Sequence, residues 1–178
     1  MGFNVAGITA LIDDMYLAII AIAGLIGVIN FVRGTILIKY AAQLGGMNSM
    51  GTRSFYSEAS IHIFAGIIMI YFASYISLVG EDLFQAQFEW NNEAEAASGL
   101  YGFGSFVLKL IKLFGVLLMF KGVLALTDKE GGSIKKFFLS TFFGLLAMYI
   151  EAVSKEFSLY TGFNPLALFI PGTSVMTL

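Results

Sequence analysis

Long apolar segments bounded by charged residues dominate the chain. Met15 to Val32 has no charged side chain and ends at Arg33, and Ala59 to Gly80 is uncharged between Glu58 and Glu81. Each is close to the ~20 apolar residues that a helix needs to cross a bilayer. Strands are usually about 5–6 residues long, so these lengths favour helices. The pattern predicts two membrane-spanning helices here.

Two further apolar segments predict a second pair of helices. Phe103 to Leu126 is apolar but contains three lysines, and Phe137 to Ile150 is short. Taken alone, each segment fits an interfacial or re-entrant helix as well as a span. A repeat of the first pair favours spans.

The repeat lies in the spacing of small and basic residues. A Gly-Val pair precedes a basic residue and a glycine at identical spacing in both halves: Gly27-Val28 with Arg33-Gly34, and Gly115-Val116 with Lys121-Gly122. A Gly-Gly pair follows, and then an apolar segment that runs from Ile61 through Gly66 to Tyr71, or from Ser140 through Gly144 to Tyr149. The alternative is chance similarity between apolar segments. A direct repeat gives both halves one orientation, unlike inverted transporter repeats.

The expected fold is therefore all-α, an integral membrane protein of about four hydrophobic helices arranged as two tandem helix-loop-helix hairpins. Residues 1–80 form the first membrane hairpin with an N-terminal segment, 81–102 an acidic connector, 103–156 the second hairpin and 157–178 an apolar C-terminal tail. Pro165 and Pro171 argue against a fifth span in the tail, because proline removes helix hydrogen bonds that lipid cannot replace.

Composition agrees with a membrane protein. The chain is 58% hydrophobic and 12% charged, against about 45–50% and about 25% in typical soluble domains. It has no cysteine and one histidine, which excludes disulfides, thiolate sites and multi-histidine metal clusters. It has no recognisable catalytic motif and no basic stripe for nucleic acid, so we expect neither an enzyme nor direct sequence-specific nucleic-acid binding. Met1 to Ile12 lacks the basic residues of a cleaved secretory signal.

Basic side chains are the candidate functional groups. We expect them to bind lipid phosphate or to line a lumen, although cations near span ends also snorkel to headgroups. The candidates are Arg33, Lys39, Lys109, Lys112, Lys121, Lys135 and Lys136. Lys109 and Lys112 share one helix face, and each would cost about 2.5–3.5 kcal/mol in lipid. They should face protein, water or phosphate, which hints at an oligomer.

Small residues within the spans are candidates for close helix packing: Ala23, Gly27, Gly34, Gly66, Gly115, Gly122 and Gly144. His62 is expected to form a hydrogen bond with a helix neighbour, because no second titratable group is apparent beside it. The alternative is a role in a proton relay. Asp13 and Asp14 are expected to cap the first span. Phe84, Phe88 and Trp90 are expected to rest the connector on the headgroup region.

The segment from Gly27 to Gly46, with Arg33-Gly34 and Gly45-Gly46, resembles the small inner-membrane proteins of type IVB secretion and conjugation systems, such as the IcmC/DotE-like and IncI-type TraQ proteins. The resemblance extends to about Val153 and carries no catalytic residue. Each half also resembles a conjugative pilin, a helical hairpin that assembles into a filament with phospholipid. A pilin usually has one hairpin and a cleaved leader, whereas this chain is expected to have two hairpins and no leader.

The resemblance implies a non-enzymatic subunit of a conjugative or type IVB secretion apparatus, in the bacterial inner membrane or in an extracellular filament after assembly. Its expected partners are membrane lipid, further copies in a homo-oligomer or polymer, and other secretion-system subunits. No cofactor is expected beyond bound phospholipid. The alternative is a small oligomeric channel or transporter that uses the lysines of the third segment, Lys109, Lys112 and Lys121, and His62 along a polar path.

Loop charge predicts the orientation. Both hairpin loops are rich in Lys and Arg, whereas the connector has only acidic charges. Basic loops stay in the cytoplasm, so both hairpin loops should face the cytoplasm, and the acidic connector and both termini should lie outside.

Cysteine labelling tests this orientation. With Ser49→Cys and Asn91→Cys made separately in the cysteine-free chain, an impermeant maleimide should label intact cells at position 91 and not at position 49. The opposite labelling would reverse the topology.

Overall fold

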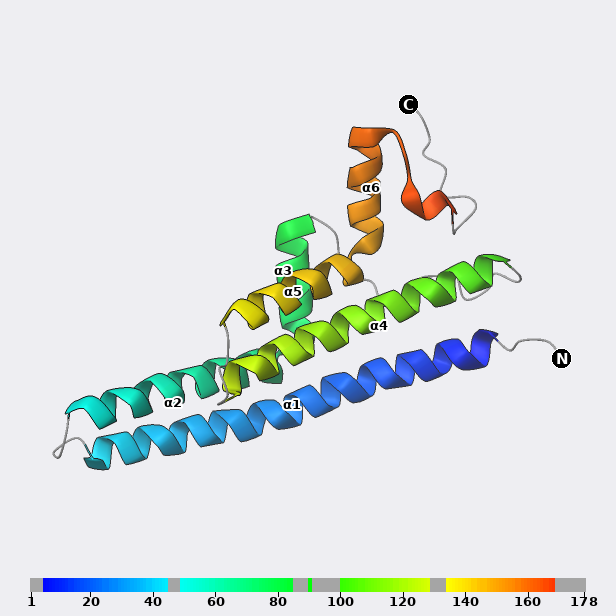
Figure 1. Cartoon of the computed structure of the whole chain (residues 1–178). Coiled ribbons are helices and arrows are strands. Elements are labelled where there is room, and N and C mark those ends of the chain that lie inside the picture. Colours follow the sequence, from blue (N-terminus) through cyan, green and yellow to red (C-terminus); the bar gives the residue numbers. More distant parts are fainter. Residues whose placement is uncertain (1–4, 45–48, 85–89, 91–99, 129–133, 169–178) are drawn as a thin grey trace.

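The computed structural model describes residues 5–44, 49–84, 90, 100–128 and 134–168, and every regular element in them is a helix. These are α1 (Val5–Leu44), α2 (Ser49–Ile70), α3 (Phe72–Phe84), α4 (Leu100–Thr127), α5 (Ile134–Met148), α6 (Ile150–Thr161) and the short 3-10 helix η2 (Pro165–Leu168). The expected all-α fold is confirmed. Helices α1 with α2 and α4 with α5 form two hairpins, and α4 lies along α1 and α2 and runs in the same direction as α1 (Figure 1).

Glycines bring the two helices of each hairpin into backbone contact. A Cβ atom on Gly27 would lie 2.6 Å from the backbone nitrogen of Ile70 and 2.9 Å from the carbonyl oxygen of Gly66. In the second hairpin, a Cβ atom on Gly115 would lie 2.6 Å from the carbonyl oxygen of Gly144. No larger residue fits at these crossings, so they set how far each pair of helices slides along its partner.

Both hairpins also break at equivalent tyrosines. Helices α2 and α3 meet at Tyr71 with a bend of 86°, and α5 and α6 meet at Tyr149 with a bend of 78°. Tyr149 has φ −101° and ψ 27°, so its ψ departs from the helical range. The predicted spans Ala59 to Gly80 and Phe137 to Ile150 therefore each contain a sharp corner, and each bent pair is a broken candidate span.

Helix α3 of the first hairpin packs against the corner of the second. The ring of Tyr149 covers Gly80, where a Cβ atom would overlap the ring, and stacks on Phe84 with centroids 5.2 Å apart. The Tyr149 hydroxyl donates to the carbonyl oxygen of Ile76 at 3.4 Å. Phe84 thus packs on protein, and its expected place at the headgroup region stays a prediction. Phe88 lies outside the described residues.

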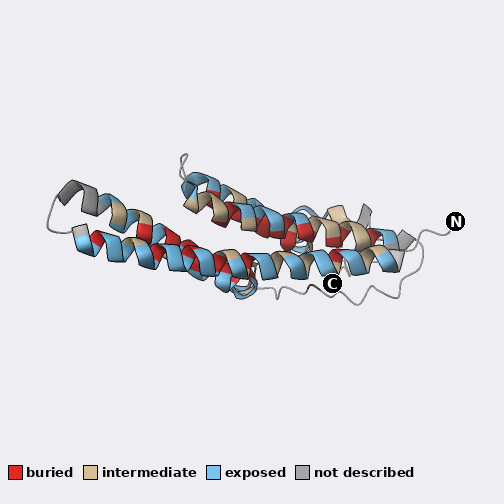
Figure 2. Ribbon diagram, turned by 90° about the horizontal axis from the view of Figure 1, so that it is seen from below, coloured by how far each residue is buried: buried red, intermediate tan, exposed pale blue. Residues whose placement is uncertain are grey.

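The main core lies where the two hairpins meet, and the outer faces stay apolar. Met69, Phe72, Ile76, Met119 and Met148 are among the fully buried side chains. Buried residues follow the facing sides of the helices, and exposed residues cover the outer sides (Figure 2). Helices α1 and α4 are long and apolar enough to cross a membrane, and each bent pair adds one further candidate span, which gives two to four.

The tail begins as helix and then folds back on itself. Helix α6 continues to Thr161, beyond the expected boundary at residue 156, and ends at Gly162, whose φ of 69° is left-handed. The Asn164 side chain then accepts hydrogen bonds from Ser154 and from the Leu166 backbone. The end of α6 and η2 are therefore packed together, up to the last described residue.

Two glycines in α1 provide a test of the backbone contact. Gly27→Ala should destabilise the protein by about 1–3 kcal/mol, because the added methyl group meets backbone. Gly24→Ala, whose Cβ would meet nothing within 4 Å, should be neutral or stabilising by up to about 1 kcal/mol. Thermal unfolding in detergent, followed by circular dichroism, measures both. Equal stability of the two variants would contradict the contact.

Candidate functional site

The buried lysines of α4 have carboxylate partners within the chain. Lys109 Nζ lies 3.1 and 3.2 Å from the two carboxylate oxygens of Asp13 in α1. Lys112 Nζ lies 2.9 Å from Glu151 Oε2 in α6. Both lysine side chains are only 3% exposed. The two cations face protein, and because their charges are balanced inside the chain they give no argument for an oligomer.

Asp13 in α1 contacts both α4 and Trp90. Besides Lys109, it accepts a 2.7 Å hydrogen bond from Trp90 Nε1, and the Trp90 ring stacks on Tyr16 with centroids 4.1 Å apart. Helix α1 begins at Val5, so Asp13 lies well inside it and the expected helix cap is wrong. Trp90 packs on α1, and its expected place among the headgroups stays a prediction.

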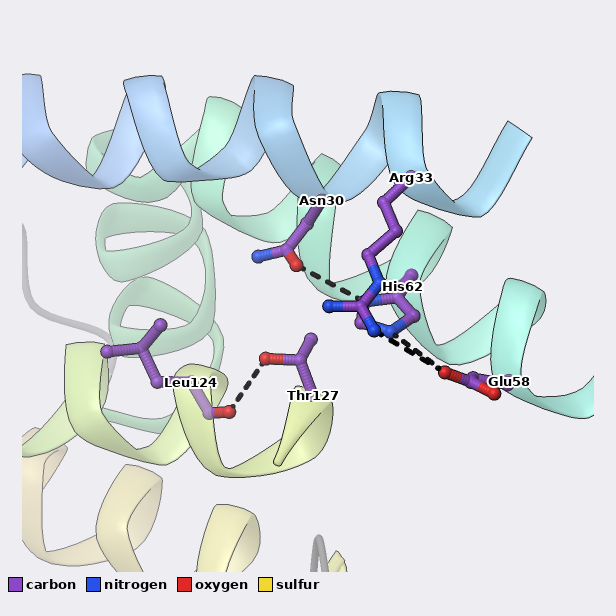
Figure 3. Close-up of polar contacts among 6 residues, drawn as sticks. All are labelled: Asn30, Arg33, Glu58, His62, Leu124 and Thr127. Atoms are coloured by element: carbon purple, nitrogen blue, oxygen red, sulfur yellow. Dashed lines mark hydrogen bonds and ion pairs between the residues drawn. The ribbon is translucent and has the colours of Figure 1, made fainter. Parts of the chain in front are cut away.

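A second polar group joins α1 to α2, and we call it the His62 cluster: Asn30, Arg33, Glu58 and His62 (Figure 3). His62 Nδ1 lies 3.2 Å from Asn30 Oδ1, and its Nε2 lies 3.7 Å from Glu58 Oε1. Because an amide oxygen only accepts, Nδ1 is the donor in the first contact. Glu58, one turn before His62, is the titratable neighbour that the sequence analysis missed.

Arg33 balances the carboxylate of this cluster. Its Nη2 lies 3.7 Å from Glu58 Oε1, and both side chains are partly exposed. Such a pair contributes about 0–1 kcal/mol, whereas His62 and Asn30 are buried. The hydrogen bond between His62 and Asn30 therefore matters more for the packing of α1 on α2 than the outer ion pair does.

A polar hollow of about 440 Å³ lies beside the cluster and reaches the end of α4. It is lined by Ser54, Ser57, Glu58, Ile61, His62, Leu126, Thr127 and Asp128. Thr127 turns its hydroxyl back onto the carbonyl of Leu124 at 2.9 Å (Figure 3). Hydroxyl groups and two carboxylates suit a small polar or cationic ligand. Among the described residues, no group of three or more His, Asp or Glu side chains could hold a metal.

The remaining candidate cations are on the surface. Lys39 near the end of α1, and Lys135 and Lys136 in the first turn of α5, are exposed. Lys121 and Lys136 line another hollow, of about 400 Å³, together with Leu124, Ala125, Thr127 and Asp128.

The candidate packing residues all lie between helices. Ala23 is completely buried in the core. Gly34 lies against Ala59 and Ile63, and Gly122 lies against Ser140. Gly27, Gly66, Gly115 and Gly144 make the backbone crossings described above.

The sequence held partial signals for the residues it missed. Asn30 is the one Asn, Gln or charged residue within the predicted first span, and Glu58 precedes His62 by one helical turn. Both features point to a polar contact. Nothing in the local sequence of Asp13 or Glu151 indicates which lysine it pairs with.

Neighbouring aspartates test the buried pair. Asp13→Asn should destabilise the protein by about 3 kcal/mol, because it leaves the Lys109 charge buried without its counter-charge. Adding Lys109→Met should recover much of the loss. Asp14→Asn, at an exposed position, should change stability by less than about 0.5 kcal/mol. Denaturant unfolding in detergent measures all three, and equal effects of the two aspartate variants would disprove a structural role for the pair.

Comparison of the chain with protein-family models, with curated proteins and with solved structures found no significant match.

Proposed function

We propose that this chain is a non-enzymatic membrane subunit of a conjugative or type IVB secretion apparatus, and that copies of it associate with one another. The observation that carries the proposal is the construction of the two hairpins. They run side by side in the same direction, cross at equivalent glycines and bend at equivalent tyrosines. The resemblance of the Gly27 to Gly46 segment to such subunits points the same way.

The outer surface supports association in an apolar environment. Leu17, Leu25, Phe114 and Phe138 are each more than 60% exposed. Soluble monomers rarely expose contiguous apolar patches above a few hundred Å². Helix α1 has 40 residues and is therefore about 60 Å long, twice the thickness of a hydrocarbon core. The hydrocarbon core can cover only part of the apolar surface of such a helix, and we propose that other subunits cover the remainder.

More specifically, we propose that this chain is the pilus subunit. It would reside in the bacterial inner membrane and enter an extracellular filament together with phospholipid. The exposed cations that could bind phosphate or line a filament lumen are Lys39, Lys121, Lys135 and Lys136, together with Arg33, which also pairs with Glu58. Lys109 and Lys112 take no such part, because they are bound to Asp13 and Glu151.

A small channel or transporter is the second candidate, favoured by the polar hollow beside His62. The pairing of Lys112 with Glu151 weakens it, since that lysine was one of the groups expected along the path. Ion flux through reconstituted vesicles that falls with His62→Ala or Lys112→Ala would favour the channel.

Deletion of the coding sequence in the producing cell tests the proposal. Transfer of DNA or protein to recipient cells should fall sharply and return with the wild-type chain or with Gly24→Ala. It should stay low with Gly27→Leu, which blocks the first helix crossing. Surface filaments sheared from the same cells should contain this chain as their main protein if it is the pilus subunit. Normal transfer after deletion would refute the secretion role.

A further inference from the structure

The two hairpins carry a basic residue at equivalent positions but differ in what faces it. By the repeat spacing, Arg33 corresponds to Lys121. Glu58 precedes Gly66 by the same number of residues as Lys136 precedes Gly144. The ion pair between Arg33 and Glu58 in the first hairpin is thus replaced by two lysines in the second.

These two lysines line one hollow. They come from α4 and α5. The two helices approach each other closely near these lysines, as shown by the 2.9 Å between a Cβ atom built on Gly122 and the Cβ atom of Ser140. Among the described residues that line the hollow of about 400 Å³, one is acidic, Asp128. Two cations against one anion leave an excess positive charge at a place where the other hairpin is neutral. An added anion would relieve the repulsion between the lysines.

We propose that the hollow formed by Lys121, Lys136 and Asp128 binds the phosphate group of a lipid headgroup. Each lysine ammonium offers three donors, and charge-assisted hydrogen bonds to phosphate are strong. Lys121 lies near the end of the candidate span Phe106–Thr127, where headgroup phosphates are concentrated. The inference rests on the proposed function only for placing α4 in a membrane. A free phosphate ion has the same chemistry and is separated by the test.

Native mass spectrometry of the purified full-length chain in detergent tests the site. The wild-type protein should retain one phosphatidylglycerol in preference to a diacylglycerol with the same acyl chains. The double variant Lys121→Gln with Lys136→Gln should bind phosphatidylglycerol at least about tenfold more weakly, since it loses two charged donors. Inorganic phosphate at millimolar concentration should leave the lipid bound. Displacement by inorganic phosphate would overturn the assignment to a headgroup and leave a site for free phosphate.

A charge-matched pair of variants separates this site from general surface attraction. Lys136→Glu gives the second hairpin the cation and carboxylate arrangement of the first, and should remove lipid retention while thermal unfolding stays cooperative. Lys155→Glu makes the same charge change at an exposed position of α6 and should weaken retention only slightly, as expected of a screened surface charge. Equal losses in the two variants, or equal binding of phosphatidylglycerol and diacylglycerol by the wild type, would refute the site.

These measurements do not depend on DNA or protein transfer. A chain that retains phosphatidylglycerol through Lys121 and Lys136 but is dispensable for transfer would keep the lipid site and lose the proposed function. A chain that is required for transfer but retains no lipid would support the proposed function and refute the lipid site.

Discussion

Contact between helix backbones at glycine determines the geometry of both hairpins. In lipid there is little hydrophobic force between helices, so close packing and polar contacts hold them together. Gly27 against Gly66, and Gly115 against Gly144, bring backbone atoms as close as two helices allow. Once these crossings are fixed, the residues one or two turns away have fixed neighbours. Arg33 then lies near Glu58, and Asn30 near His62.

The corners at Tyr71 and Tyr149 create a contact between the two hairpins. Each turns the last part of its hairpin away from the long axis, so that α3 and α6 project to one side of the molecule (Figure 1). Helix α3 then meets the second corner, where Tyr149 covers Gly80 and donates to Ile76. The ion pair of Lys109 with Asp13 adds a further connection between the hairpins.

The buried charges have a cost that their pairing offsets. Moving an ammonium group out of water costs several kcal/mol, and a partner carboxylate restores most of it only in a good geometry. Such pairs add little net stability but disfavour any arrangement that separates them. Lys109 with Asp13 and Lys112 with Glu151 therefore specify how α4 sits against α1 and α6. The lysines at 121 and 136 differ, because Asp128 is the one acidic side chain among the described residues of the hollow that they line.

The sequence alone determined the helices, their apolar character and the small residues at which they cross. These follow from local properties: the length of uncharged segments and the spacing of Gly27, Arg33, Gly115 and Lys121. The tertiary structure decided the corners, because neither Tyr71 nor Tyr149 has an adjacent proline or glycine to mark a break. It also decided the partners of Lys109 and Lys112 and the place of Trp90. Those contacts join residues far apart in the chain, and only the docking of whole helices brings their side chains within hydrogen-bonding distance.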